Sequence, residues 1–180
     1  MNEISLHIFD LLENSIRAGA GIISISITEN TDKDYISILI EDNGRGLKAG
    51  PDKVMDPFYT TKKEKRIGLG LSLFRAAAEQ AGGYLNLRES KPGGLCIEVN
   101  MRLSHINRVP MGNLAETISA VILTNPRLEL RLIYWVNKKV FKIETLKMFR
   151  EIDQTQEQFA LAELVKKRIN SGLVKIGSKA

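Results

Sequence analysis

A chain of 180 residues, 43% of them hydrophobic and 26% charged, is long enough for one large domain or for one domain with an added unit. This composition excludes a mainly disordered chain, and no apolar run approaches the length of a membrane span. The net charge of +5 excludes little by itself, and because the N-terminus lacks a signal-peptide pattern we expect a cytoplasmic protein without a membrane partner.

The first hundred residues alternate between helical and extended patterns. Apolar residues recur at helical spacing from Ile4 to Ile16, and the glycine-containing stretch 18–21 ends that helix. Cys96 lies in an alternating run and is expected to be a buried apolar residue. The order helix, two strands, loop, helix, two strands predicts an α/β (α+β) two-layer sandwich, with one helical layer on a mixed sheet. The remaining predicted elements are a helix from residue 68 to about 81 and strands over 23–27, 35–42, 84–89 and 95–102.

A break in composition around Pro110 and Gly112 separates two parts of the chain. We predict a domain over residues 1–104, a linker over 105–112 and a C-terminal α/β appendage over 113–180. The appendage, with about 70 residues, is too short for a fully independent core, so we expect this small α-β-β-α unit to dock on the first domain. Its predicted elements are helices over 114–124, 144–151 and 155–171 and strands over 128–134 and 136–143.

Positive charge is concentrated in the second part of the chain. Residues 1–104 carry a net charge of −1, and residues 105–180 carry a net charge of +6. Such an excess could mark an acidic or nucleic-acid partner, but no dense basic run is present, and solvated basic faces explain the excess more simply. We therefore expect no nucleic-acid partner, because the aromatic residues that could stack on bases are better placed in a core. These residues are Tyr134, Trp135, Phe141 and Phe149.

An acidic residue and two glycines stand at the end of the strand predicted over 35–42. In this segment, residues 42–46, Gly44 and Gly46 would let the backbone approach a ligand closely, and the Asp42 carboxylate could accept a hydrogen bond from a flat donor. Asp-Asn-Gly is also a common turn, so this motif gains meaning only from its neighbours.

The first helix carries three polar residues, His7, Asp10 and Asn14, on one face at spacing i, i+3 and i+7. The amide oxygen of Asn14 suits a hard cation such as Mg²⁺ that phosphates already hold. Asp10, one turn earlier, could accept a proton from water or orient an attacking hydroxyl. The alternative is a solvated face, because these residues lie opposite the apolar stripe.

Glycines recur where a loop becomes the second predicted helix, over residues 66–72. Free backbone N–H groups and the positive end of that helix favour a polyphosphate, and the nearby cations Lys62, Lys63, Lys65 and Arg66 could add counter-charge. The spacing is not that of a P-loop, and no strand precedes it as in a dinucleotide fingerprint.

Together and in this order, these segments resemble the GHKL ATPase superfamily, which includes histidine kinases, gyrase, mismatch-repair ATPases and anti-sigma-factor kinases. The resemblance covers about residues 1–103 and implies the Bergerat ATP-binding fold, in which ATP lies between helices under a mobile lid. Residues 47–67 would form that lid. The similar motifs are the N box at residues 11–20, the first glycine box at 42–46, the F box of histidine kinases at 56–62 and the second glycine box at 68–72.

The resemblance implies roles for individual residues in binding the cofactors ATP and Mg²⁺. Asn14 would bind Mg²⁺, and Asp10 would be catalytic. Asp42 would hold adenine, with Gly44 and Gly46 shaping its pocket. The other cofactor-binding residues would be Lys62, Arg66, Gly68, Leu69, Gly70 and Leu71.

Several positions depart from the family pattern. Arg66 replaces the first glycine of the usual Gly-x-Gly-x-Gly, and Leu95 follows Gly94 where relatives carry a threonine, so a hydroxyl near the adenine-binding aspartate is missing. Either a water substitutes for that hydroxyl or adenine binds more weakly. We expect no phosphoacceptor domain, and His7, which lacks the context of a phosphoacceptor, is expected to be an ordinary histidine of the site rim or helix face.

Two functions remain open at this point. In the first, the chain is a stand-alone ATP-dependent kinase of the histidine-kinase type, which transfers the γ-phosphate to a residue on a separate signalling protein. In the second, it is a slow ATPase, a conformational switch that regulates a partner without phosphorylating it. The F box and the short lid favour the kinase. The sequence identifies neither the partner nor the input signal, and a homodimer is compatible with either function.

Overall fold

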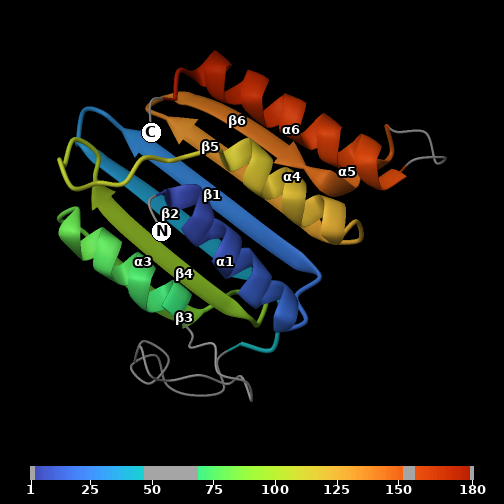
Figure 1. The fold of residues 1–180 in the computed structure, drawn as a ribbon, viewed down its shortest axis with the longest axis horizontal. Coiled ribbons are helices and arrows are strands. Elements are labelled where there is room, and N and C mark those ends of the chain that lie inside the picture. Colours follow the sequence, from blue (N-terminus) through green and yellow to red (C-terminus); the bar gives the residue numbers. More distant parts are fainter. Residues whose placement is uncertain (1–2, 47–68, 152–156, 179–180) are drawn as a thin grey trace.

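The computed structural model of the chain describes residues 3–46, 69–151 and 157–178. Its elements, in chain order, are α1 (Ile4–Arg17), β1 (Ile22–Asn30), β2 (Tyr35–Asp42), α3 (Leu69–Gln80), β3 (Tyr84–Glu89), β4 (Leu95–Arg102), α4 (Leu114–Thr124), β5 (Glu129–Val136), β6 (Lys139–Glu144), α5 (Thr145–Phe149) and α6 (Glu157–Ile176). The strands form one six-stranded sheet in the order β3-β4-β2-β1-β5-β6 (Figure 1). This is the predicted two-layer α/β architecture, and the fold-class prediction is confirmed.

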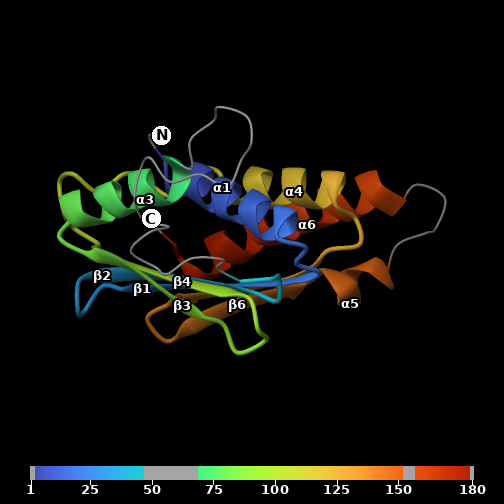
Figure 2. The same cartoon turned by 90° about the horizontal axis from the view of Figure 1, so that it is seen from below.

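One face of the sheet carries the helices. Helices α1, α3, α4 and α6 lie side by side in a single layer over the strands (Figure 2). Strands β1 and β2 alternate strictly between buried and partly exposed residues, because successive side chains point to opposite faces of the sheet. Most of the buried residues are isoleucines that point to the helical side, whereas Ile22 and Leu39 lie on the open face. In their antiparallel register Ile25 pairs with Ile40 and Ile27 with Ile38, and all four side chains are buried in the core. The Ser-Ile alternation in the sequence therefore defines which face of the sheet is buried.

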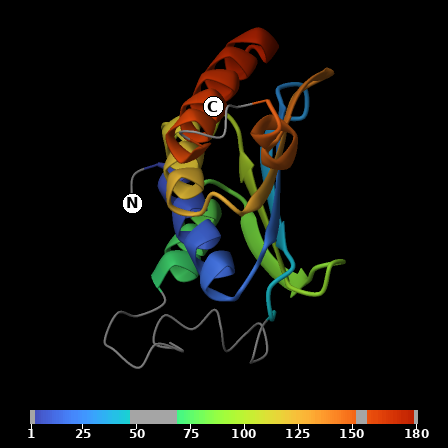
Figure 3. The ribbon, with the colours of Figure 1, turned by 90° about the vertical axis from the view of Figure 1, so that its right-hand side faces the viewer.

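The second part of the chain extends the same sheet. Strand β5 pairs with β1 in parallel, with Leu132 opposite Ile25, and β6 pairs with β5 in antiparallel. Among the described strands only the β1–β5 pair is parallel, so the sheet is mixed through β5, whereas the four strands of the first part, for which the sequence predicted a mixed sheet, pair in antiparallel. Helices α4 and α6 continue the helical layer beside α1 (Figure 3). The residues after the linker thus share one sheet and one hydrophobic core with the residues before it.

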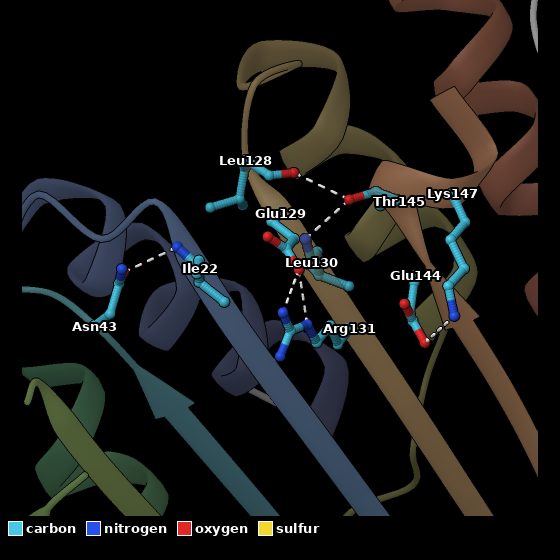
Figure 4. Close-up of polar contacts among 9 residues, drawn as sticks. All are labelled: Ile22, Asn43, Leu128, Glu129, Leu130, Arg131, Glu144, Thr145 and Lys147. Carbon is cyan, nitrogen blue, oxygen red and sulfur yellow. Dashed lines mark hydrogen bonds and ion pairs between the residues drawn. The ribbon is translucent and has the colours of Figure 1, made fainter. Parts of the chain in front are cut away.

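Side-chain hydrogen bonds strengthen this join. Asn137, in the turn between β5 and β6, accepts a hydrogen bond from Thr31 N at 2.9 Å and donates to Thr31 Oγ1 at 2.8 Å. The Thr145 hydroxyl accepts from Leu130 N at 2.9 Å and donates to Leu128 O at 3.0 Å (Figure 4). These bonds connect the two β-hairpins and fix α5 at the start of β5.

The sequence located most elements, and the differences have simple causes. The last helix runs to Ile176, beyond the predicted end at 171, and stops at Gly177, whose φ of +76° suits a helix C-terminus. Trp135 was expected in the core but is 36% exposed, because it lies on the open face of the sheet. Cys96 is buried, as predicted. Among the described residues no helix is long and apolar enough to cross a membrane.

Candidate functional site

The described residues among those that the sequence singled out for the site lie at one end of the molecule. The C-terminal ends of α1 and β2, the turn between β3 and β4 and the beginning of α3 all lie at this end (Figures 1 and 3). Helix α1 contacts β2 through Ser15 and α3 through Asp10, and the β3–β4 turn contacts the end of β2. The site is therefore built from four separate segments, and the packing of α1 and α3 on the sheet brings them together.

Asp42, the last residue of β2, is the centre of this arrangement. Its side chain is 2% exposed. Ser15 Oγ donates to Oδ2 at 2.7 Å, while the backbone N–H groups of Gly44 and Leu95 donate to Oδ1 at 2.9 and 3.2 Å. The carboxylate is thus held by three donors that are all electrically neutral.

The turn between β3 and β4 closes on the same residue. The Ser90 hydroxyl donates to Asp42 O at 2.5 Å and accepts from Gly94 N at 2.8 Å. A β-carbon at Gly94 would lie 2.2 Å from Asp42 Oδ1, a distance that no side chain tolerates. Glycine is therefore required at position 94, because the two backbones touch there.

The residues after Asp42 are tied to the end of α1. Asn43 Oδ1 accepts from the backbone N–H groups of Gly21 and Ile22, each at 2.9 Å (Figure 4 draws the second). Arg45 N donates to Ala18 O at 3.1 Å. The segment that contains Gly44 therefore has a defined conformation even though it lies outside any strand or helix. Gly46 follows with a φ of +66°, and a β-carbon there would lie 3.6 Å from Gly94 O.

Asp10 and the start of α3 are in direct contact. A β-carbon at Gly70 would lie 3.1 Å from Asp10 Oδ2, so the carboxylate rests against the first turn of α3. One turn earlier on α1, the His7 ring stacks on Phe74 with ring centroids 4.5 Å apart and an interplanar angle of 5°. A carboxylate beside a helix N-terminus is electrostatically favourable, so this contact can either stabilise α3 or present the carboxylate to a ligand.

The sequence had suggested that His7 lies on the site rim or on a helix face, but in the structure this residue is buried. It is 2% exposed, and neither ring nitrogen has a hydrogen-bond partner among the described residues. Burial of the imidazole lowers the pKa of His7 to about 4, with a smaller contribution from the positive N-terminus. The prediction was wrong because α3 covers this part of the α1 face. A buried, stacked imidazole is not accessible for phosphorylation.

Asn14 is exposed and lies one turn after Asp10 on the same side of α1. Its Oδ1 accepts a hydrogen bond from Arg17 Nη2 at 3.3 Å. Sequence reasoning overlooked Arg17, although its spacing of three residues from Asn14 places the two side chains together. The guanidinium adds a positive charge beside the amide, where a phosphate would be favoured.

Several predicted site residues lie outside the described part of the chain. They are Lys62, Arg66 and Gly68, together with the proposed lid over residues 47–67. Leu69 is the first residue of α3, and the Leu71 side chain is partly buried against the core. The structure brings together Asp10 with Gly70 and Asp42 with Gly44, and it adds three residues that sequence reasoning missed: Ser15, Arg17 and Ser90.

A separate shallow groove of about 390 Å³ lies on the other flank of α1. It contains none of the predicted site residues and is mainly apolar. Its walls come from the end of α1 and the turn between α4 and β5, so it follows the junction between the two parts of the sheet. It is lined by Ile16, Ala20, Gly21, Asn125, Pro126, Arg127 and Leu128.

A known family matches the part of the chain that builds this site. The model of the histidine kinase-, DNA gyrase B- and HSP90-like ATPases matches residues 2–105, which is more than half of the chain. The chain therefore belongs to this family of ATPases, and the predicted GHKL relationship is confirmed. ATP binding is the general function that this membership supports.

Individual relatives share the same region. The chain is 26% identical over 106 residues to a putative NtrY-like sensor histidine kinase of Rickettsia bellii (strain RML369-C), which covers 59% of this chain and 17% of the relative. It is 29% identical over 98 residues to the sensor protein KdpD of Escherichia coli (strain K12), covering 52% of this chain and 11% of the relative. The chain thus spans less than a fifth of the length of these curated relatives.

Two solved structures resemble part of this fold. One is the ATP-binding domain of PrrB from Mycobacterium tuberculosis, with 25% identity, a TM-score of 0.42 and coverage of 54% of this chain and 64% of that one. The other is the Aquifex aeolicus MutL ATPase domain complexed with ADP, with 17% identity, a TM-score of 0.46 and coverage of 79% and 64%.

Proposed function

We propose that the chain binds Mg-ATP at the meeting point of α1, β2, the β3–β4 turn and α3. In this proposal Asp42 binds the adenine amino group, and Gly44 and Gly46 give the base close access to the backbone. The start of α3, with Gly70, would bind phosphate through backbone N–H groups at the positive end of the helix. Asp10 would then lie near the terminal phosphate.

The observation that carries this proposal is the environment of Asp42. A carboxylate with 2% exposure that only neutral donors hold, with no ion pair among the described residues, is uncommon, because buried acidic residues usually pair with a cation. A buried carboxylate that is fixed in orientation at the end of a strand is a candidate polar group for orienting a ligand. An adenine amino group would supply a further N–H donor.

The residues present also fit a magnesium ion that arrives with the nucleotide. Among the described residues no group of three or more His, Cys, Asp or Glu side chains could hold a metal by itself. Mg²⁺ bound to a nucleotide needs only one or two protein oxygens, because phosphates and waters fill its other positions. The amide oxygen of exposed Asn14 would be such a ligand, through the lone pair that the long hydrogen bond from Arg17 leaves open. The ion would neutralise negative charge on the phosphates.

We assign the bound ATP to phosphoryl transfer onto a separate partner protein. The relatives that share this region carry the names sensor histidine kinase and sensor protein. His7 is buried and stacked on Phe74, which argues against an acceptor on α1 itself. Asp10 would orient the attacking side chain of the partner and accept its proton as the bond to the γ-phosphorus forms, while the bond from the γ-phosphorus to the bridging oxygen breaks and ADP leaves.

An ATP-driven switch is the second candidate, and one contact favours it. Asp10 rests against the first turn of α3, so it could orient a water molecule instead of a partner side chain. The product would then be free phosphate, and a movement of α3 against α1 would carry the signal to a partner.

Radioactive ATP distinguishes the two functions. The purified chain is incubated with ATP labelled at the γ-phosphate, with and without lysate of the source cells. A discrete labelled protein that depends on the chain supports the kinase, whereas release of free phosphate without a labelled protein supports the switch. If the chain neither transfers the label to a protein nor releases free phosphate, both proposed functions are contradicted.

Substitutions test the role of Asp10 in the same assay. Asp10→Asn should abolish transfer or hydrolysis and leave ATP binding intact, because the amide keeps the shape but cannot accept a proton. Glu13→Gln is the matched control, since it neutralises another carboxylate of α1 and should leave turnover unchanged. Turnover that survives Asp10→Asn would exclude the catalytic role.

A further inference from the structure

The Asp42 carboxylate has one hydrogen-bond acceptor position open, on Oδ2, among the described residues. Each carboxylate oxygen can accept about two hydrogen bonds. Oδ1 already accepts from the backbone N–H groups of Gly44 and Leu95, so it is saturated. Oδ2 accepts only from the Ser15 hydroxyl, at 2.7 Å, among the described residues. A ligand can therefore reach Asp42 only through Oδ2.

Ser15 determines what kind of group this position accepts. A hydroxyl has one proton, and Ser15 donates that proton to Asp42 Oδ2. Its own oxygen then offers only lone pairs. The buried end of the site thus presents two acceptors side by side, which match the two N–H donors of an amino group and repel the lone pairs of a carbonyl oxygen.

Ser90 keeps the carboxylate in this orientation. Its hydroxyl joins Asp42 O to Gly94 N at 2.5 and 2.8 Å, and Ser90 itself is only 6% exposed. This bridge holds the backbone of the β3–β4 turn against Asp42, so that Leu95 N reaches Oδ1. Without the bridge, Oδ1 would lose a donor and the carboxylate could rotate.

We propose that Ser15 and Ser90 are positioning residues that make the site selective for a purine with a 6-amino group over one with a 6-oxo group. They take the place of the threonine hydroxyl that is absent at Leu95. This inference rests on the proposed function, because it assumes that Asp42 receives the base.

The experiment compares the affinities of three nucleotides by titration calorimetry: ATP, inosine triphosphate with its 6-oxo group, and purine riboside triphosphate, which has no group at position 6. The wild type should bind ATP at least tenfold more tightly than either analogue. Ser15→Ala removes the hydrogen bond to Oδ2, and Ser90→Ala releases the turn that places Leu95 N on Oδ1. Each should weaken ATP binding about tenfold, the effect of one lost hydrogen bond to the carboxylate. The affinity for purine riboside triphosphate should change less than twofold, since it does not use Oδ2.

Two further variants make the result specific. Ser15→Thr keeps the hydroxyl and should restore the preference for ATP. Ser119→Ala, which removes another buried serine hydroxyl on α4, should behave like the wild type. If the melting curve shows that Ser90→Ala does not fold, the test rests on Ser15→Ala alone, through the ratio of its affinities for ATP and for purine riboside triphosphate.

The outcomes separate this inference from the proposed function. Equal weakening of ATP and purine riboside triphosphate by Ser15→Ala, or an unchanged preference for ATP, would overturn the positioning role. Asp42→Asn should abolish the preference in any case. If Asp42→Asn abolishes it while Ser15→Ala and Ser90→Ala do not, only the inference fails. If Asp42→Asn leaves it unchanged, the adenine assignment fails as well.

Discussion

The buried imidazole of His7 makes the stability of the protein depend on pH in a defined window. In the folded chain the pKa of His7 is about 4, whereas an exposed histidine has a pKa of 6.5. Between pH 4 and pH 6.5, His7 therefore binds a proton in the unfolded state but not in the folded state. The contribution of His7 to the free energy of unfolding is fully present above pH 6.5 and is lost as the pH is lowered toward 4.

The size of this effect follows from the two pKa values. Between pH 7.5 and pH 5 the full shift corresponds to about 2 kcal/mol of unfolding free energy, and residual solvent screening reduces the expected loss to about 1–2 kcal/mol. His7→Phe should remove this loss, because a phenyl ring can still stack on Phe74 but does not titrate. At pH 7.5 the variant should be at least as stable as the wild type, since it no longer buries two ring nitrogens that have no hydrogen-bond partner among the described residues.

Urea unfolding provides the measurement, with the fluorescence of the single tryptophan, Trp135, as the probe. Free energies of unfolding are obtained for the wild type and His7→Phe at pH 7.5 and pH 5. Carboxylates titrate in both proteins alike, so the difference between the two pH-dependent losses isolates His7. Equal losses in the two proteins would refute the assignment of the shift to burial against α3.

Further predictions concern the site and the second part of the sheet. Gly94→Ala should lower ATP affinity at least tenfold, because its β-carbon would displace the Asp42 carboxylate from the base; calorimetry measures this, and wild-type affinity would exclude the close contact. Tyr134→Phe should cost about 0.5–1.5 kcal/mol in urea unfolding, because the hydrogen bond from its hydroxyl to buried Glu29 at 2.6 Å is lost while the Ser178 hydroxyl still donates to the same carboxylate. The control Tyr84→Phe removes an exposed bond to Glu98 and should cost less than about 0.5 kcal/mol; an equal cost would contradict the role of burial.

The sequence was sufficient to predict the strands of the first part of the chain. The alternation of serine and isoleucine in β1 has a period of two, and that period alone determines which side chains face a core. The predicted bounds of β3 and β4 agree with the structure because clear turn residues flank both strands. The parallel pairing of β5 with β1 could not be predicted, since it depends on contacts between residues about a hundred positions apart.

The candidate site shows the same division between local and distant information. Residues 42–46 could be selected from the sequence because an acid and two glycines directly after a strand form a local pattern. Ser15 and Ser90 could not, because a single serine has no pattern of its own, and these two lie 27 and 48 residues from Asp42. His7 was misplaced for a related reason, since the face of α1 that its spacing defines is covered by α3, which comes later in the chain.

The most direct test of the central claim is the affinity for ATP in the presence of Mg²⁺, measured by titration calorimetry for the wild type and Asp42→Asn. The wild type should bind one ATP per chain, and Asp42→Asn should bind it more weakly by about 1–3 kcal/mol, the cost of a lost hydrogen bond to a buried charged acceptor. Equal affinities in the two proteins, or no binding by the wild type, would contradict the account of this site.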